Sequence, residues 1–261
     1  MAPEWIPEWF ILSLVAVVGL IFGSFVTLAS YRLPRDEPIV MGRSRCPSCK
    51  NTLGLLALFP LFSWLIQCGK CGYCKAPVSA RYPITEAVQA LLFIAVYVSQ
   101  GLTWQAGVLA LLSVALLIMV VVDFEWYIIP DEIQITCVIL AVLYHWVAAT
   151  PIDNVLAGAA MGLALGFGLR FGYGWLRKKE GLGWGDVKFL FVAGLWLASI
   201  EDWPAFLFYA GMLGVITAVI WRAMGKGERF PFGPALAGAL LLTLLTPSTP
   251  LFFWTIGRIY A

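Results

Sequence analysis

Seven long runs without a charged residue restrict what this chain can fold into. A membrane-spanning helix needs about 20 consecutive apolar residues, and runs of that length are uncommon in soluble domains. The composition agrees, because 61% of the 261 residues are hydrophobic, only 12% are charged, and the mean hydropathy is +0.87. Disordered chains, ordinary soluble enzymes and nucleic-acid-binding proteins need more charge, so these classes are excluded. The runs occupy residues 9–30, 87–122, 133–152, 154–169, 189–200, 203–221 and 230–257.

These runs predict eight transmembrane helices. The run at 87–122 is long enough for two helices with a turn near residues 99–101, and the run at 189–200 is the shortest. No alternation typical of a membrane β-barrel is present, and helices are the other structure that satisfies every backbone polar group in lipid. Gly158, Gly162 and Gly166 form two overlapping G-x-x-x-G steps, which predict close helix packing. We therefore predict an all-α polytopic membrane protein.

The basic residues predict how these helices are oriented. If Met1 lies outside and eight helices cross, the four cytoplasmic segments hold 8, 0, 5 and 3 Lys and Arg residues, or 16 of the 17 in the chain. Such an excess is the positive-inside pattern. No basic residue precedes the first run, so we expect a retained helix rather than a signal peptide, with both termini outside. The cytoplasmic segments would be 31–83, 123–132, 170–188 and 222–229.

Five of the six cysteines fall in the largest of these cytoplasmic segments. Two C-x-x-C pairs, Cys46 with Cys49 and Cys71 with Cys74, are separated by 21 residues. Four thiolates at such spacing can close a tetrahedral zinc site, whereas disulfides are disfavoured on the reducing side of the membrane. Two alternatives stay open from the residues alone. Cys68 also stands three residues before Cys71 and could replace a ligand, and the cysteines could be reduced without a metal.

Other apolar and buried positions receive structural interpretations. Residues 53–66 are apolar for 14 residues, which is too short for a span, so they are predicted to form an interfacial or packed segment. Cys137, within a predicted helix, is expected to be a small buried side chain. His145 is the single histidine of the chain and is expected to pack between helices rather than to act as a base.

Two carboxylates stand where charge is costly. Asp123 ends the third predicted helix, and Asp186 opens the sixth within Gly183-x-Gly185-Asp186, at what the topology makes the cytoplasmic end of both helices. Ionisable groups at membrane depth are candidate functional sites. Two carboxylates in a poorly hydrated cleft share a proton, so one can activate water while the other donates to a scissile carbonyl. Gly183 and Gly185 are candidate substrate-binding positions, because they place no side chain against an approaching peptide.

Structural roles and other functions compete with this aspartic-protease interpretation. Asp123 and Asp186 could cap helices or pair with Lys188 or Arg170, and Asp131 is expected to cap a helix. A thiol–disulfide membrane oxidoreductase would use the C-x-x-C pairs, but it would need them on the oxidising face. An ion-coupled transporter would use the aspartates as cation sites, but such sites usually lie near the membrane midplane.

The motifs and their order resemble those of bacterial type IV prepilin peptidases, a family of G-x-G-D membrane aspartic proteases. The resemblance extends over almost the whole chain. The matching motifs are Gly23-Ser24-Phe25, Tyr31-Arg32-Leu33-Pro34, the two cysteine pairs, Arg81-Tyr82-Pro83 with Glu86, Asp123, Ile129-Pro130-Asp131, Gly183-x-Gly185-Asp186-Val187-Lys188 and Pro231-Phe232-Gly233-Pro234.

The resemblance implies a set of site residues and activities. Asp123 and Asp186 would be the catalytic aspartates. Cys68 would be an extra residue, and the ligands of a structural Zn²⁺ would be Cys46, Cys49, Cys71 and Cys74. The substrates would be type IV prepilins and the pseudopilins of type II secretion, cut after the glycine that ends a short basic leader, on the cytoplasmic side of the bacterial inner membrane. Many members then methylate the new N-terminus with S-adenosylmethionine.

The same reasoning divides the chain into three parts. A first helix at 1–30 precedes a cytoplasmic zinc-binding region at 31–83, which could include the methyltransferase part. A seven-helix protease domain follows at 84–261. Thr27 stands where relatives often carry Asn, and no S-adenosylmethionine fingerprint is recognisable, so methyl transfer rests on the resemblance alone.

Overall fold

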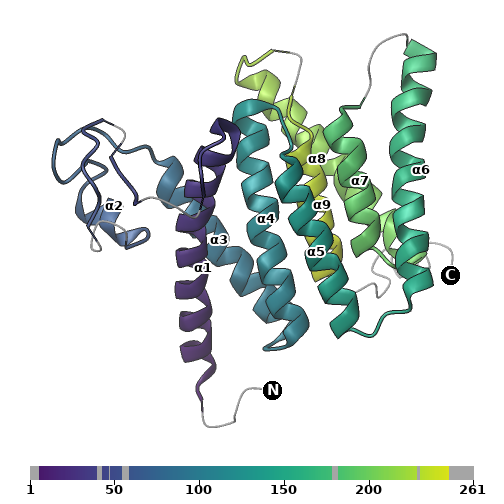
Figure 1. Cartoon of the computed structure of the whole chain (residues 1–261), viewed down its shortest axis with the longest axis horizontal. Helices are drawn as coiled ribbons and strands as arrows, with labels where there is room; N and C mark the ends of the chain where they lie inside the picture. Colours follow the sequence, from purple (N-terminus) through teal and green to yellow (C-terminus); the bar gives the residue numbers. More distant parts are fainter. Residues whose placement is uncertain are drawn as a thin grey trace, which may run out of the picture.

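The described part of the chain is built from helices. The computed structural model describes residues 6–39, 43–46, 48–54, 59–177, 182–227 and 230–246. Within them, the extended structure assigned is two isolated β-bridges. The helices (Figure 1) are α1 (Glu8–Arg32), α2 (Phe62–Ile66), α3 (Arg81–Gln100), α4 (Trp104–Trp126), α5 (Asp131–Val147), α6 (Ile152–Arg177), α7 (Trp184–Trp196), α8 (Trp203–Ala223) and α9 (Gly233–Leu245), with 3-10 turns at Leu33–Arg35 and Ile200–Asp202.

A helix lies at each of the eight positions that the charge-free runs predicted. The longest run divides into α3 and α4 next to the expected turn. Five helices, α1, α3, α4, α6 and α8, are long and apolar enough to cross a membrane. α5, with 17 residues, and α7 and α9, with 13 each, are shorter. The eight crossings and the outward position of both termini therefore stay predictions, and the end of the last run lies outside the described residues.

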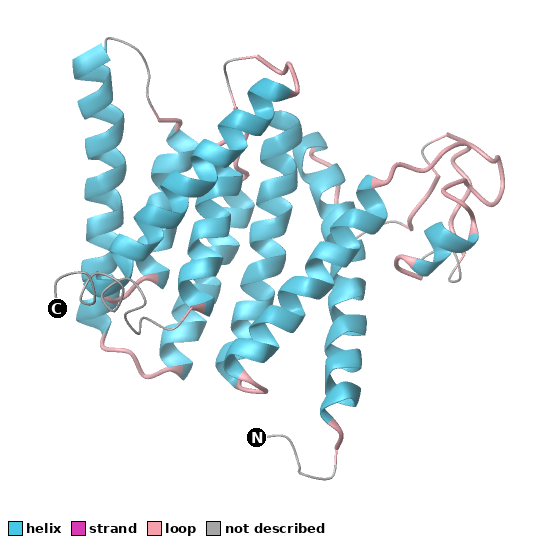
Figure 2. Cartoon of the chain, turned by 180° about the vertical axis from the view of Figure 1, so that it is seen from behind, coloured by secondary structure: helices cyan, strands magenta, loops and turns pink. Residues whose placement is uncertain are grey.

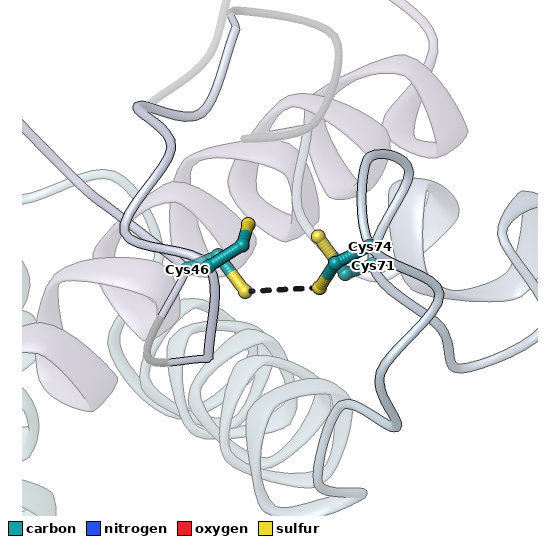
Figure 3. Close-up of side chains that lie close together, drawn as sticks. Cys46, Cys71 and Cys74 are labelled. Carbon is teal, nitrogen blue, oxygen red and sulfur yellow. Dashed lines mark hydrogen bonds between the residues drawn. The ribbon is translucent and has the colours of Figure 1, made fainter.

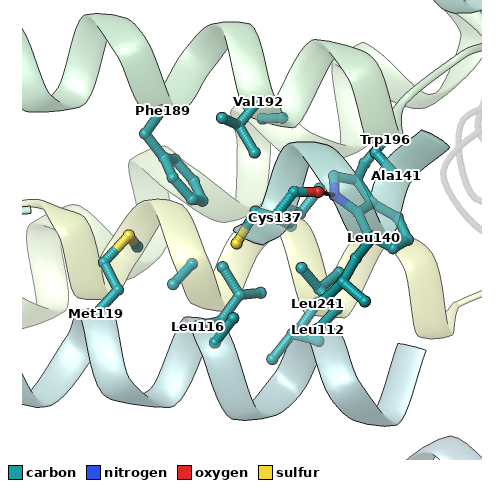
Figure 4. Packing of buried hydrophobic residues seen from close by; sticks show 14 of the residues in the cluster. Leu112, Leu116, Met119, Cys137, Leu140, Ala141, Phe189, Val192, Trp196 and Leu241 are labelled. Carbon is teal, nitrogen blue, oxygen red and sulfur yellow. Dashed lines mark hydrogen bonds between the residues drawn. The ribbon is translucent and has the colours of Figure 1, made fainter. Parts of the chain in front are cut away.

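The core of the bundle is formed by α4, α5, α7 and α9. Figure 4 shows their side chains meeting face to face, with Leu116 of α4, Cys137 of α5, Phe189 of α7 and Leu241 of α9 among them. Leu116, Cys137 and Phe189 are fully buried, which confirms the expected burial of Cys137. Lipid is as apolar as these side chains, so close van der Waals contact rather than the hydrophobic effect holds such helices together.

Two polar contacts fix α5 against α7. Trp196 Nε1 donates to the Cys137 carbonyl at 3.1 Å. His145 Nε2 lies 2.8 Å from the carbonyl oxygen of Leu195, and its Nδ1 lies 3.0 Å from Thr150 Oγ1. His145 is buried and joins helices, as the sequence predicted. These contacts hold α7, the helix that carries Asp186, in one position against α5.

The glycine steps of α6 form a seam against α7. A Cβ added at Gly158 would meet the carbonyl oxygens of Gly194 and Leu197, and one at Gly162 would meet the Leu190 carbonyl. The predicted close packing is confirmed. Because the two backbones touch, a larger residue on the seam would push α7 away from α6.

The chain between α1 and α3 forms a separate lobe, which we call the cysteine module (residues 43–80, with gaps at 47 and 55–58). It contains α2 and lies beside α1, level with the upper half of that helix in Figures 1 and 2. The backbone N–H of Leu61 donates to Glu86 Oε2 of α3 at 2.7 Å, which fastens the module to the bundle. In the described part of the predicted segment 53–66, the only helix is the five-residue α2, too short to span.

Candidate active site and metal centre

Four helix ends meet where the two candidate catalytic residues lie. α5 and α9 each pack against α4, which carries Asp123, and against α7, which carries Asp186. Asp123 is in the last turn of α4 and Asp186 is in the first turn of α7. The C-terminal end of α4 and the N-terminal ends of α5, α7 and α9 thus lie together, at the upper end of the bundle in Figure 1.

The carboxylate of Asp123 is buried and held by a backbone donor. Asp123 is only 5% exposed. Its Oδ2 accepts a hydrogen bond of 2.8 Å from the N–H of Gly233, the first residue of α9. A Cβ at Gly233 would stand 2.6 Å from that same oxygen, so only glycine fits at this position without displacing the carboxylate. The bond joins residues 110 positions apart.

Asp186 is half-buried and also caps its own helix. Its Oδ2 accepts a hydrogen bond of 3.2 Å from the backbone N–H of Gly183, the N-cap of α7. The alternative of a helix-capping role is therefore realised for this residue. The Ile129 side chain lies against both Gly185, next to Asp186, and Gly233, whose N–H binds Asp123, so the two aspartates stand at the same end of the bundle. The fold brings together two carboxylates that are 63 positions apart in the sequence.

The two basic residues that were weighed as partners for the aspartates bind other groups. Lys188 Nζ lies 2.8 and 2.9 Å from the two carboxylate oxygens of Asp131. Asp131 begins α5 and lies in its first turn, as expected, but the N-cap is Pro130, and the Asp131 side chain pairs with Lys188 of α7 instead of capping the helix. Arg170 donates to the Leu182 carbonyl, and its guanidinium lies 4.3 Å from the ring centre of Trp184.

The two candidate substrate-binding glycines lie at the start of α7. A Cβ at Gly183 would be 3.1 Å from Asp186 Oδ2, and one at Gly185 would be 3.2 Å from Ile129 Cβ. Ile129 also reaches Gly233, where a Cβ would lie 3.4 Å from its Cδ1. Crowding by neighbouring side chains of the protein itself thus explains why glycine stands at both positions. Their contact with a substrate stays a prediction.

Sequence reasoning missed the roles of Gly233 and Ile129. Both stand within motifs of the family resemblance, Pro231-Phe232-Gly233-Pro234 and Ile129-Pro130-Asp131, and that was the available signal. Neither carries a group that can titrate or bind a metal. Their positions matter because the Gly233 N–H donates to Asp123, and the Ile129 side chain fills the space between the first turns of α7 and α9.

Arg81 joins this end of the bundle to the first helices through two polar contacts. Arg81, the first residue of α3, places its Nε 2.8 Å from Glu125 Oε1, and its guanidinium also donates to Ser30 Oγ of α1 at 2.7 Å. Glu125 stands two residues beyond Asp123. Arg81 therefore links α1, α3 and α4 close to Asp123. The cysteine module is the segment of chain between α1 and α3, so this link also lies near both ends of the module.

The four predicted metal ligands come together in the cysteine module. The sulfur atoms of Cys46, Cys49, Cys71 and Cys74 all lie within 4.8 Å of one another. Figure 3 shows Cys46, Cys71 and Cys74 with their sulfurs turned to a common centre, and Cys46 Sγ is 3.9 Å from Cys74 Sγ. All are free thiols. Four sulfur donors at this separation fit the tetrahedral coordination of a structural zinc ion.

The two cysteine knuckles have the same backbone fold. Cys46 N–H donates to the Asn51 carbonyl, and Cys71 N–H donates to the carbonyl of Ala76, five positions on in both cases. Lys50 and Lys75 each take a positive φ, 60° and 61°, at the same place in the turn. An isolated β-bridge closes each knuckle. Two matched turns facing each other are what a shared metal requires.

The backbone geometry of the first knuckle also favours the thiolate form of Cys46. The backbone N–H of Cys49 points at Cys46, and this contact, helped by the N–H of Ser48, lowers the pKa of the Cys46 thiol to about 6 although burial opposes the shift. A thiolate is the form that binds a metal.

Cys68 lies outside this cluster. It is exposed, takes a positive φ of 50°, and is not among the residues whose sulfurs gather. Its position agrees with the ligand set that the family resemblance implied. The overlapping pair Cys68 and Cys71 is therefore not the second knuckle.

Two family descriptions match the chain. "Bacterial Peptidase A24 N-terminal domain" matches residues 17–100, which include the cysteine module, and "Type IV leader peptidase family" matches residues 110–219, which include Asp123 and Asp186. No solved structure shows significant similarity to the chain.

Curated relatives match over almost their whole length. A protein of Aeromonas hydrophila is 30% identical over 91% of this chain and 91% of its own. One of Pseudomonas aeruginosa is 31% identical over 88% of both chains, and one of Bacillus subtilis is 32% identical over 93% of this chain and 97% of its own. Each is named "Prepilin leader peptidase/N-methyltransferase". With this coverage and with the two family matches, the chain belongs to the type IV leader peptidase family.

Proposed function

We propose that this protein removes the leaders of type IV prepilins and type II secretion pseudopilins, with Asp123 and Asp186 as its catalytic pair. The observation that carries the proposal is the convergence of four helix ends that brings one buried and one half-buried carboxylate together. The cut would follow the glycine that ends the leader, at the cytoplasmic face of the bacterial inner membrane.

The chemistry needs one proton shared between two carboxylates. The ionised member takes a proton from a water molecule, whose oxygen attacks the carbonyl carbon of the scissile peptide. The protonated member donates its proton to the carbonyl oxygen. The tetrahedral intermediate then collapses, the C–N bond breaks, and the leaving nitrogen takes the proton that came from the water. The Gly233 N–H holds Asp123 in place through these steps.

Substrate selection would follow from depth in the membrane. A prepilin places an apolar helix in lipid and a basic leader in the cytosol, so its cut site lies at the interface. The carboxylate pair stands at helix ends, which is the matching depth. The residues next to the pair include exposed aromatic side chains of the kind found at membrane interfaces, namely Phe124, Trp126, Tyr127 and Trp184.

The cysteine centre would bind structural zinc. The four thiols fit that ion, and the module around them has few buried apolar residues besides the cysteines themselves. A metal would supply the stability that such a small lobe lacks.

We also propose that the protein N-methylates the processed pilin with S-adenosylmethionine, as the names of the relatives state for those proteins. No residues for this cofactor are assigned among the described ones. The mass of the processed N-terminus, measured with and without S-adenosylmethionine, tests the activity. One added methyl group, 14 mass units by elementary composition, supports it, and an unchanged mass contradicts it.

The test of the catalytic pair uses isosteric variants. Asp123→Asn and Asp186→Asn should insert and fold but leave a prepilin uncut in detergent solution, seen as no shift on a gel. Glu132→Gln, an exposed carboxylate in the first turn of α5, is the matched control and should cut normally. Normal cutting by either aspartate variant would refute the assignment.

An oxidoreductase or a transporter function agrees less well with the structure than a protease function does. An oxidoreductase needs a reacting cysteine pair, whereas four free thiols share one centre here. A transporter would place its ionisable groups in the middle of a span, whereas Asp123 and Asp186 lie in terminal turns.

A further inference from the structure

The cysteine module exposes a group of large apolar side chains. Phe59, Phe62, Leu65 and Ile66, which we call the α2 patch, are 57%, 50%, 54% and 81% exposed. They lie on or directly before α2. A cluster of this kind on a surface that faces water is unusual, and it marks a contact with lipid or with another protein.

The module also carries charge of a single sign. Between residues 38 and 85 the sequence has six basic residues and no Asp or Glu. Five of the six stand on the module and are exposed, and none of them forms an ion pair with the described residues. They are Arg43, Arg45, Lys50, Lys70 and Lys75. An apolar patch with basic residues near it is typical of a segment that lies in an anionic membrane surface.

The position of the module fits such a surface. α1 has 25 residues and is therefore about 37 Å long, against about 30 Å for the hydrocarbon core of a bilayer. Two opposite views show the module beside α1, level with its upper half rather than beyond its end (Figures 1 and 2). When α1 spans the membrane, α2 lies at the depth of the cytoplasmic leaflet.

The lipid-facing surface of α3 begins beside the module. Ile84, Leu91 and Val98 recur every seven residues along α3 and are 60%, 65% and 70% exposed, so they form one outward stripe. Glu86 stands on the opposite, buried side of the same turn, against α1, and accepts the Leu61 N–H. The α2 segment is therefore fastened to the first turn and a half of α3, at the end of the helix where the outward stripe begins.

We propose that the cysteine module is itself a membrane-binding element. The α2 patch enters the boundary between headgroups and acyl chains of the cytoplasmic leaflet, and the basic residues around it bind anionic lipid headgroups. The prepilin leader is a poor alternative occupant, because it is basic and the module would repel it. The inference goes beyond the proposed function, and its test does not require cleavage.

The test places a photoreactive benzoylphenylalanine at Ile66 of the full-length protein in lipid nanodiscs. The matched control carries the same probe at Asn51, an exposed position at the turn of the first knuckle. After irradiation, mass spectrometry should find phospholipid adducts on the variant with the probe at position 66 and none on the variant with the probe at position 51. An unchanged unfolding temperature in detergent shows that both variants are folded.

The charge component is tested in nanodiscs that mix phosphatidylglycerol and phosphatidylcholine. The adducts at position 66 should be enriched in phosphatidylglycerol over its share of the lipid, and Lys70→Gln with Lys75→Gln should reduce the enrichment. Equal amounts of lipid adduct at the two probe positions would overturn the proposal. So would adducts at position 66 that contain an added prepilin, or a second copy of the chain, in place of lipid.

Discussion

A single backbone N–H fixes the buried carboxylate of the proposed catalytic pair. A Cβ at Gly233 would stand 2.6 Å from Asp123 Oδ2, so Gly233→Ala should displace the carboxylate. Misplacement of a catalytic group by about 1 Å costs about a hundredfold in rate. We expect a loss of that order in the cleavage rate of a purified prepilin.

The matched control for Gly233 is another helical glycine. Gly211 of α8 has no atom within 4 Å of its added Cβ, so Gly211→Ala should cleave at the wild-type rate. A similar loss in both variants would mean that alanine harms the helices in general, and a normal rate for Gly233→Ala would remove the proposed positioning role.

The cysteines allow a second prediction about single residues. Cys71→Ser removes a sulfur from the gathered set, whereas Cys68→Ser changes an exposed residue outside it. Metal analysis of the purified variants should find about one zinc ion per chain for wild type and Cys68→Ser, and much less for Cys71→Ser. Equal metal loss in the two variants would reassign the ligand, and absence of zinc from the wild type would contradict the zinc proposal.

At the scale of elements, the α6–α7 seam makes a prediction about stability. Gly162→Val would force a side chain into the Leu190 carbonyl, and such overpacking costs about 2 kcal/mol. We expect a lower unfolding temperature in detergent and slower leader cleavage, because α7 carries Asp186. Gly168→Val, on the same helix but with open space around its Cβ, is the control. If both variants unfold alike, the seam is not what holds α7.

Much of the helix pattern follows from local properties of the sequence. Runs without charge predicted where α1 to α9 lie, except for the short α2, because an apolar run of sufficient length has few other structures available in lipid. The two C-x-x-C pairs predicted the cysteine centre because metal ligands need fixed spacing. The close contact of α6 with α7 followed from the spacing of Gly158, Gly162 and Gly166.

Contacts between distant residues were not predictable in the same way. The bond from Gly233 to Asp123 joins a backbone group to a side chain 110 positions away, and a backbone group has no signature in the sequence. Lys188 lies two residues from Asp186 in the sequence, yet it pairs with Asp131, because the packing of α5 on α7 decides which carboxylate it reaches. Which helix ends converge depends on the packing of the whole bundle.

For the whole molecule, Cys68 offers a test of orientation. It is exposed and lies outside the gathered set, so a membrane-impermeant maleimide should label it in inside-out vesicles and leave it unlabelled in intact spheroplasts. The predicted topology, with the module on the cytoplasmic side, requires this result. Cys68→Ser is the control and should lose the label. Labelling of wild-type spheroplasts at this residue would reverse the orientation and move the carboxylate pair to the outer face.

The hydrogen bond between Gly233 and Asp123 has a consequence for biosynthesis. The ribosome completes α4 and α7, which carry Asp123 and Asp186, before it reaches α9. A nascent chain can therefore contain both carboxylates before Gly233, whose N–H binds Asp123, has been added. The proposed catalytic pair would therefore be complete only after translation has passed residue 233, and a chain that stopped before α9 would carry both aspartates without the donor that fixes Asp123.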